Sequence, residues 1–221
     1  MKVIFFILGL IVGLMLQKPA HAVQFDIAIG QTRFQQSNDT DWWQTGPASE
    51  GFSNDFNLKS TSYRIGISDN LTRNVRWTAG YANLGNVSSR AVATNYDEEY
   101  DAVHQRCVSS GCEMVTYSGK GSVDGYYLTI APETKVLGVT VYGEVGAWVY
   151  FPKFSMTKSH DSGYVYQVPV KNGTETGPVL GFGLRVENMT LAARFYKVDH
   201  NGQLPAIYQG FASEVSLGWI F

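Results

Sequence analysis

The feature that most constrains this chain is a two-residue alternation of apolar with small or polar residues, which recurs in eight segments. Tyr63, Ile65 and Ile67, for example, flank Arg64 and Gly66. Successive side chains of a β-strand point to opposite faces, so each segment is predicted to be a strand with one apolar face. The predicted strands cover residues 25–30, 63–67, 75–81, 126–130, 137–149, 180–186, 191–195 and 211–221.

The connections between these segments alternate between short and long. Three links are tight, at residues 68–73, 131–135 and 187–190, and the long links cover about residues 35–57, 85–121, 152–175 and 199–208. All short turns then lie at one end of an antiparallel up-and-down sheet, and all long loops lie at the other. Eight strands joined in this way favour a closed barrel, because closure leaves no free sheet edge.

The polar parity of the strands distinguishes a soluble barrel from a transmembrane one. A soluble barrel or sandwich buries its apolar parity, whereas a transmembrane barrel turns it to lipid and packs the polar parity inside. Here the polar parity combines charged residues with Gly, Ala, Ser and Thr, which suits the narrow lumen of an eight-stranded barrel. We therefore predict an all-β, eight-stranded transmembrane barrel with long outer loops and a polar lumen network of Asp26, Arg64, Arg76, Glu144, Arg185, Arg194 and Glu214.

The first 22 residues are predicted to be a secretory signal peptide. A basic start and a short apolar run lead to Ala20-His21-Ala22, a pattern typical of cleavage between Ala22 and Val23. The barrel domain is then expected to be residues 23–221. No apolar run of about 18 residues follows, so a helical membrane protein is excluded. A formal net charge of −2 gives no basic footprint for nucleic acid.

Cys107 and Cys112 are the two cysteines of the chain, and they are five positions apart. Because an exported chain reaches an oxidising compartment, we predict a short disulfide between them that constrains one loop locally. Two unpaired thiols are the alternative. A metal site is not expected, because no fourth ligand is apparent, and no cofactor is predicted.

The last segment, residues 211–221, carries apolar residues at alternate positions, including Trp219, and ends in Phe221. This pattern resembles the assembly signal of bacterial outer-membrane proteins, and the whole architecture resembles the small OmpA/OmpX-type barrels. The resemblance implies a monomer in the outer membrane of a Gram-negative cell, inserted by the barrel-assembly machinery and in contact with membrane lipid and lipopolysaccharide. No periplasmic domain is expected after Phe221.

The lumen charges admit two interpretations. Burying a charge is costly unless it is paired, so the four arginines and three acids of the predicted network should form a ladder of ion pairs. As a functional element, such a ladder is a gate whose pairs exchange to open a small pore. As a structural element, it is a static polar plug, and we favour the plug.

A hydrolase is a second alternative. His160 and Ser162 are two positions apart, so on a strand they would share a face, and Glu175 could complete a triad. The arrangement loosely resembles the His-x-Ser of lipid A deacylase barrels, but no Asn follows Ser162. We expect a protein that is not an enzyme, with a lipid A or phospholipid hydrolase as the alternative.

The outer loops carry the main functional prediction. Trp42 and Trp43 lie in a polar loop, and Tyr164 and Tyr166 alternate on the parity of the segment at 180–186. The segments at 137–149 and 180–186 are therefore predicted to protrude as a β-ribbon that binds partners by strand addition. We predict a surface protein that mediates adhesion, colonisation and virulence, or surface protection, through a host or matrix ligand; packing of these aromatics within the loops is the alternative.

Overall fold

A computed structural model of the protein describes residues 23–36, 53–94, 100–101, 106–107, 114–168, 173–199 and 207–221. In this part of the chain almost every residue lies in a strand. The strands are β1 (Gln24–Gln36), β2 (Ser53–Asn57), β3 (Lys59–Thr72), β4 (Val75–Thr94), β5 (Tyr100–Asp101), β6 (Arg106–Cys107), β7 (Met114–Val136), β8 (Val139–His160), β9 (Val165–Val168), β10 (Glu175–Val186), β11 (Met189–Lys197) and β12 (Tyr208–Ile220).

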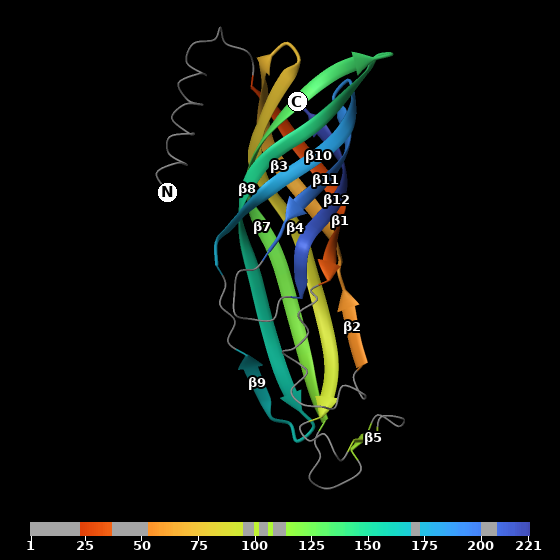
Figure 1. Ribbon diagram of the computed structural model, residues 1–221, viewed down its shortest axis with the longest axis vertical. Coiled ribbons are helices and arrows are strands. Elements are labelled where there is room, and N and C mark those ends of the chain that lie inside the picture. The colour runs from red at the N-terminus through yellow and green to blue at the C-terminus, as the bar shows by residue number, and fades with distance from the viewer. Residues whose placement is uncertain are drawn as a thin grey trace.

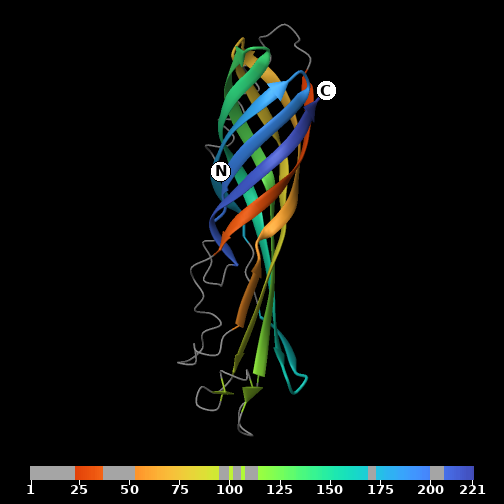
Figure 2. The same cartoon turned by 90° about the vertical axis from the view of Figure 1, so that its right-hand side faces the viewer.

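Eight strands close into a barrel by antiparallel pairing in the order β1–β3–β4–β7–β8–β10–β11–β12, and β12 pairs back onto β1. Figures 1 and 2 show the tilted strands of this barrel in the upper half of the molecule. The ring closes near the C-terminus, where Phe25 and Phe221 exchange two backbone hydrogen bonds of 3.1 and 2.8 Å. The predicted fold class, an eight-stranded up-and-down barrel, is confirmed.

The three short turns lie at one end of the barrel, as predicted, but each is only two residues long. The turn at Leu137-Gly138 has φ values of 51° and 87°. Positive φ at both positions is the geometry of a type I′ turn, whose twist matches that of the flanking strands. The strands therefore extend further into the turns than the apolar alternation alone indicated.

The predicted long loops at 85–121 and 152–175 are wrong over much of their length. Residues 85–94, 114–121 and 152–160 continue β4, β7 and β8, which reach 20, 23 and 22 residues. With β2 paired to β4 and β9 paired to β8, these continuations form a five-stranded sheet in the order β2–β4–β7–β8–β9, which we call the outer ribbon. It projects from the barrel in the lower half of Figure 1.

The ribbon also differs from the prediction in its strands. We expected the segments at 137–149 and 180–186, which lie in β8 and β10, to protrude together. Instead β10 begins its pairing with β8 at Glu175 opposite Tyr150. The protruding part of β8 pairs on one side with β7, which remains in register as far as Val115 opposite His160, and on the other side with β9.

The outer face of the barrel is an apolar belt. Its side chains are 39–60% exposed although they are large and hydrophobic, among them Ile27, Ile29, Ile65, Ile67, Ile130, Val145, Phe182, Leu184, Leu191, Val215 and Leu217. The inward parity carries buried Arg, Glu, Ser and Thr side chains. Apolar side chains outside and polar side chains inside are the reverse of the pattern in a soluble protein. This distribution is typical of a barrel that is surrounded by lipid hydrocarbon.

A row of outward aromatic rings bounds the belt at the end opposite the short turns. Tyr63 and Tyr81 are 6.2 Å apart between ring centroids, Tyr81 and Tyr126 are 5.6 Å apart, and Tyr126 and Phe151 are 6.3 Å apart. On β7, Tyr126 to the strand end at Val136 is 11 residues, and a strand needs about 9–11 to cross a bilayer. We call this row the aromatic girdle.

Among the residues that the structure describes, no helix is long and apolar enough to cross a membrane.

Candidate functional site

The upper part of the barrel lumen holds a chain of alternating charges. Glu144 accepts from Arg194 Nε at 2.9 Å and from Arg64 Nη2 at 3.5 Å. Arg194 Nη1 lies 3.8 Å from Glu214 and donates to Ser216 at 2.8 Å. The four charged side chains are all less than 10% exposed. We call this series, Arg64–Glu144–Arg194–Glu214, the first ladder.

A second ladder lies nearer the short turns. Arg76 lies between Asp26 at 3.7 Å and Glu133 at 3.9 Å, and Glu133 accepts from Arg185 at 2.9 Å. Seven of the eight residues in the two ladders were predicted from strand parity, and the eighth, Glu133, was not. It was assigned to a turn at 131–135, whereas β7 continues to Val136.

Glu133 changes the charge balance of the lumen. The two ladders together contain four arginines and four carboxylates, so the network is neutral within the described residues. A neutral and mutually paired set keeps each buried charge compensated. This arrangement is suited to filling the lumen rather than to selecting an ion of one sign.

Aromatic side chains fill the lumen beyond the first ladder, towards the outer ribbon. Trp148 stacks on Tyr150 with ring centroids 4.6 Å apart and lies 4.9 Å from Tyr196, and Tyr208 lies 4.8 Å from Phe34. The Trp148 Nε1 group donates to the carbonyl of Lys197 at 3.0 Å. These rings are at most 2% exposed. We call this group the aromatic plug.

The aromatic plug was not predicted from the sequence, although the sequence carries a signal for it. Trp148 and Tyr150 share the parity of Glu144, and Tyr196 shares that of Arg194. Extending the inward parity of each strand past its charged residue would have placed these rings in the lumen. They were passed over because aromatic residues were expected only on the lipid face.

Three features are together typical of transmembrane β-barrels. They are the apolar belt, the neutral polar lumen, and the aromatic girdle about one bilayer thickness from the short turns. The chain is an outer-membrane β-barrel. Its short turns occupy the periplasmic end and the outer ribbon the cell-surface end, as in barrels of this type.

The outer ribbon has two edge strands, β2 and β9, and the predicted contact residues lie at the β9 edge. Strand β9 pairs with residues 156–159 of β8 on one side and is the last strand of the sheet order. Tyr164 just before it is 62% exposed, Val165 is 60% exposed and Tyr166 is 45% exposed. The predicted contact residues Tyr164 and Tyr166 therefore lie beyond the membrane at a sheet edge that is unpaired among the described residues.

The structure does not bring the candidate hydrolytic residues together. His160 ends β8, and its ring lies 5.7 Å from that of Tyr164, while Ser162 is exposed in the following turn. Glu175 is paired with Tyr150, ten positions along β8 from His160. At about 3.3 Å per residue, this separates the carboxylate from the imidazole by roughly 30 Å of strand.

Several predicted features lie outside the described residues. These are the signal peptide with Ala22, the tryptophans Trp42 and Trp43, and Cys112; Val23 is described and is 56% exposed. Only the backbone of Cys107 is placed, on β6 opposite Tyr100. The disulfide and the signal cleavage therefore stay predictions. Among the described residues, no group of three or more His, Cys, Asp or Glu could hold a metal ion.

No protein-family model and no curated protein sequence matches the chain. Solved structures that are similar to it include the attachment invasion locus protein Ail of Yersinia pestis, at 12% identity over 91% of this chain and 100% of that one, with a TM-score of 0.42. Neisserial surface protein A is similar at 12% identity over 92% and 98% of the two chains, with a TM-score of 0.38. At these values the barrel assignment rests on the strand register and the distribution of side chains.

Proposed function

We propose that this outer-membrane barrel is a surface-binding protein that uses the free edge of β9 to take up an extended segment of a partner protein. The single observation that carries the proposal is an aromatic-bearing strand edge that no described residue pairs with, held beyond the membrane by continuous strands of the barrel itself. Adhesion to host or matrix surfaces is the activity that this edge supports best. Colonisation, virulence and surface protection are its expected consequences.

The backbone groups available at this edge follow from the hairpin geometry. The amide of His160 donates to the carbonyl of Tyr164 at 2.8 Å. Because bonded and non-bonded pairs alternate along an antiparallel ladder, Tyr166 opposite Lys158 is the next bonded pair. Val165 and Gln167 then direct their N–H and C=O groups away from β8, where a partner strand can add.

The side chains around the edge favour a protein partner. Tyr164, Val165 and Tyr166 are all more than 40% exposed, and aromatic residues are enriched where proteins meet. Exposed edges are normally protected by charge, by proline or by a short edge strand. β9 is only four residues long and Pro169 follows it in the sequence, but Tyr164 and the four residues of β9 themselves carry neither charge nor proline. A partner strand of a few residues can therefore add at this edge.

The described residues favour neither alternative function. The neutral ladders and the aromatic plug occupy the lumen that a small pore would need. The acid proposed for a hydrolase pairs with β8 ten positions from the histidine. Insertion by the barrel-assembly machinery, contact with lipopolysaccharide and a monomeric state stay predictions from the sequence.

The test uses a proline that removes an outward donor without touching the β8–β9 ladder. Bacteria displaying the protein with Gln167→Pro would be compared with bacteria displaying Gln167→Ala, at matched outer-membrane amounts. Adherence would be scored on cultured epithelial cells and on immobilised fibronectin, laminin and collagen. We expect Gln167→Pro to reduce adherence at least fivefold on the surface that the unaltered protein binds, and Gln167→Ala to leave it unchanged.

Equal adherence of both variants would refute strand addition at β9. A double variant, Tyr164→Ser/Tyr166→Ser, then distinguishes backbone pairing at the edge from contacts made by the tyrosine side chains. Loss of adherence in this variant alone would indicate that the partner binds the side chains. No adherence to any surface by the unaltered protein would refute the binding function. In that case mass spectrometry of lipid A from cells with and without the protein would test the hydrolase.

A further inference from the structure

Two cations lie side by side on the outside of the barrel. Arg33 on β1 is directly opposite Lys59 on β3 in the strand register, and both side chains are outward and exposed. Like charges placed directly opposite each other on one face of a sheet are destabilising. Repulsion between Arg33 and Lys59 therefore lowers the free energy of unfolding of the barrel unless an anion lies between them.

No acidic group among the described residues forms an ion pair with either cation. Other cations of the same rim are neutralised locally: Lys197 lies 2.7 Å from Asp199, and Lys153 lies 2.6 Å from Asp124. Within the part of the chain that the structure describes, Arg33 and Lys59 form no ion pair. Two positive charges are thus left facing outwards at one point of the barrel wall.

The height of the pair places it at the outer limit of the headgroup layer of the outer leaflet. Lys59 is four positions beyond Tyr63 of the aromatic girdle on the same face of β3. That is roughly 13 Å along the strand, or roughly 10 Å of height at a tilt of about 40°. The polar headgroup layer begins at the girdle and is roughly 5–7 Å thick, so the two residues lie at its outer limit.

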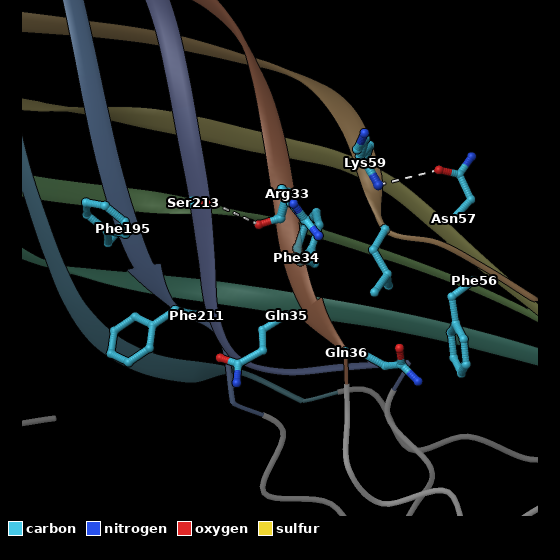
Figure 3. Close-up of a pocket in the computed structure, with 11 residues that line it drawn as sticks. Arg33, Phe34, Gln35, Gln36, Phe56, Asn57, Lys59, Phe195, Phe211 and Ser213 are labelled. Atoms are coloured by element: carbon cyan, nitrogen blue, oxygen red, sulfur yellow. Dashed lines mark hydrogen bonds between the residues drawn. The ribbon is translucent and has the colours of Figure 1, made fainter.

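Apolar side chains lie beside the two cations. Arg33 is in register with Ser213 on β12, and Ser213 is in register with Phe195 on β11, so the phenyl ring is two strands from the guanidinium. Phe211 lies on the same face, and these residues border a hollow of about 660 Å³ on the barrel wall. Figure 3 shows Phe195 and Phe211 on one side of Arg33 and Phe56 on the other.

We propose that this hollow binds one phosphorylated lipid of the outer leaflet, with its phosphate between Arg33 and Lys59 and an acyl chain along Phe195 and Phe211. A guanidinium binds phosphate through two parallel N–H···O bonds, and an ammonium adds a point charge beside it. The bound anion removes the repulsion between the two cations. The phenyl rings continue into the apolar belt, which gives the acyl chain a surface that free phosphate cannot use.

This lipid site is independent of the β9 edge. It lies on β1, β3, β11 and β12, whereas the edge is carried by β8. A failure of one proposal leaves the other standing. If the lipid site exists, the barrel should be more stable in a leaflet of phosphorylated lipid than in a leaflet of neutral lipid.

The experiment measures binding of diphosphorylated lipid A to the folded protein in a nonionic detergent, by native mass spectrometry across a lipid titration. The test variant is Arg33→Gln/Lys59→Gln. The matched control is Arg73→Gln/Lys135→Gln, which removes the same charge from exposed positions at the short-turn end. Folding of each variant is checked by the difference in gel mobility between unboiled and boiled samples.

We expect the unaltered protein and the control to bind one lipid A with the same affinity, and the test variant to bind at least tenfold more weakly. The test variant should also have a higher unfolding temperature than the unaltered protein without lipid, because the repulsion is gone, and should gain less from added lipid. If the two cations only stabilised the fold, the test variant would instead have a lower unfolding temperature than the unaltered protein without lipid.

Three results would overturn the proposal. Equal binding by the test variant and the unaltered protein would refute the site, and equal weakening in both double variants would show that only net charge matters. Displacement of lipid A by an equal concentration of inorganic phosphate would show an anion site without a lipid component.

Discussion

Glu144 is predicted to be the residue on which the first ladder depends. It is the carboxylate partner of two arginines, Arg64 at 3.5 Å and Arg194 at 2.9 Å, and its side chain is 4% exposed. Glu144→Gln keeps the size of the side chain and removes the charge. Arg194 then retains Glu214 at 3.8 Å, but Arg64 is left with the ring of Tyr127, 4.0 Å from its guanidinium.

The magnitude follows from this loss of partners. Leaving one charge of a buried pair without its partner costs about 3–5 kcal/mol, so Glu144→Gln should lower the free energy of unfolding by about 3 kcal/mol. Glu214→Gln should cost only about 1 kcal/mol: Arg194 keeps Glu144, and the amide oxygen can still accept from Ser62. Adding Arg64→Met to Glu144→Gln restores neutrality and should recover about half of the loss.

The assay is urea-induced unfolding of the purified barrel in phosphatidylcholine vesicles, followed by tryptophan fluorescence and by gel mobility. The order of stability is the decisive result: unaltered protein, then Glu214→Gln, then the double variant, then Glu144→Gln. A cost for Glu144→Gln no larger than that for Glu214→Gln would refute the dependence on shared partners. A double variant less stable than Glu144→Gln would refute the argument from charge balance.

Three further outcomes follow from the backbone and the aromatic plug. Gly146→Ala should destabilise the barrel by more than about 2 kcal/mol, because its Cβ would meet the backbone of Leu128, whereas Gly143→Ala, with nothing within 4 Å, should be neutral in the same urea assay. Leu137→Asn should raise the unfolding free energy by about 0.5–1 kcal/mol, since φ at this position is 51° and Asn tolerates the left-handed region; an unchanged urea midpoint would contradict it. Trp148→Ala should cost about 3–5 kcal/mol; unchanged stability would mean that the plug does not pack the lumen.

The fold class could be predicted from the sequence because a membrane permits few arrangements of β-strands. Backbone groups in hydrocarbon must be paired, so eight alternating strands must close on themselves. The parity of Glu144, Arg194 and Glu214 also follows directly, since a strand has only two faces. The register that brings Arg194 within 2.9 Å of Glu144 does not follow, because it depends on how far each strand is staggered against its neighbour.

The outer ribbon could not be predicted for a different reason. Beyond the girdle, β7 reads Met114-Val-Thr-Tyr-Ser-Gly-Lys, in which Ser, Gly and Lys are as common in loops as in strands. Once the lipid is left behind, the outward parity is no longer apolar and the alternation fades. What keeps these residues in strands is pairing with residues far away in the sequence, such as Ser118 with Arg90 on β4 and with Thr157 on β8.

The length of β7 has a consequence for the cell surface. Twelve residues of this strand, Met114 to Gly125, lie beyond the girdle, and they reach roughly 40 Å along the strand. The strands on the opposite wall, β10, β11 and β12, have 12, 9 and 13 residues, so they end near the membrane. The outer ribbon therefore extends from one side of the barrel only. Its reach above the membrane determines whether a partner can contact β9. This strand should be accessible on cells with short surface polysaccharide and hidden on cells whose sugar chains extend further than the ribbon.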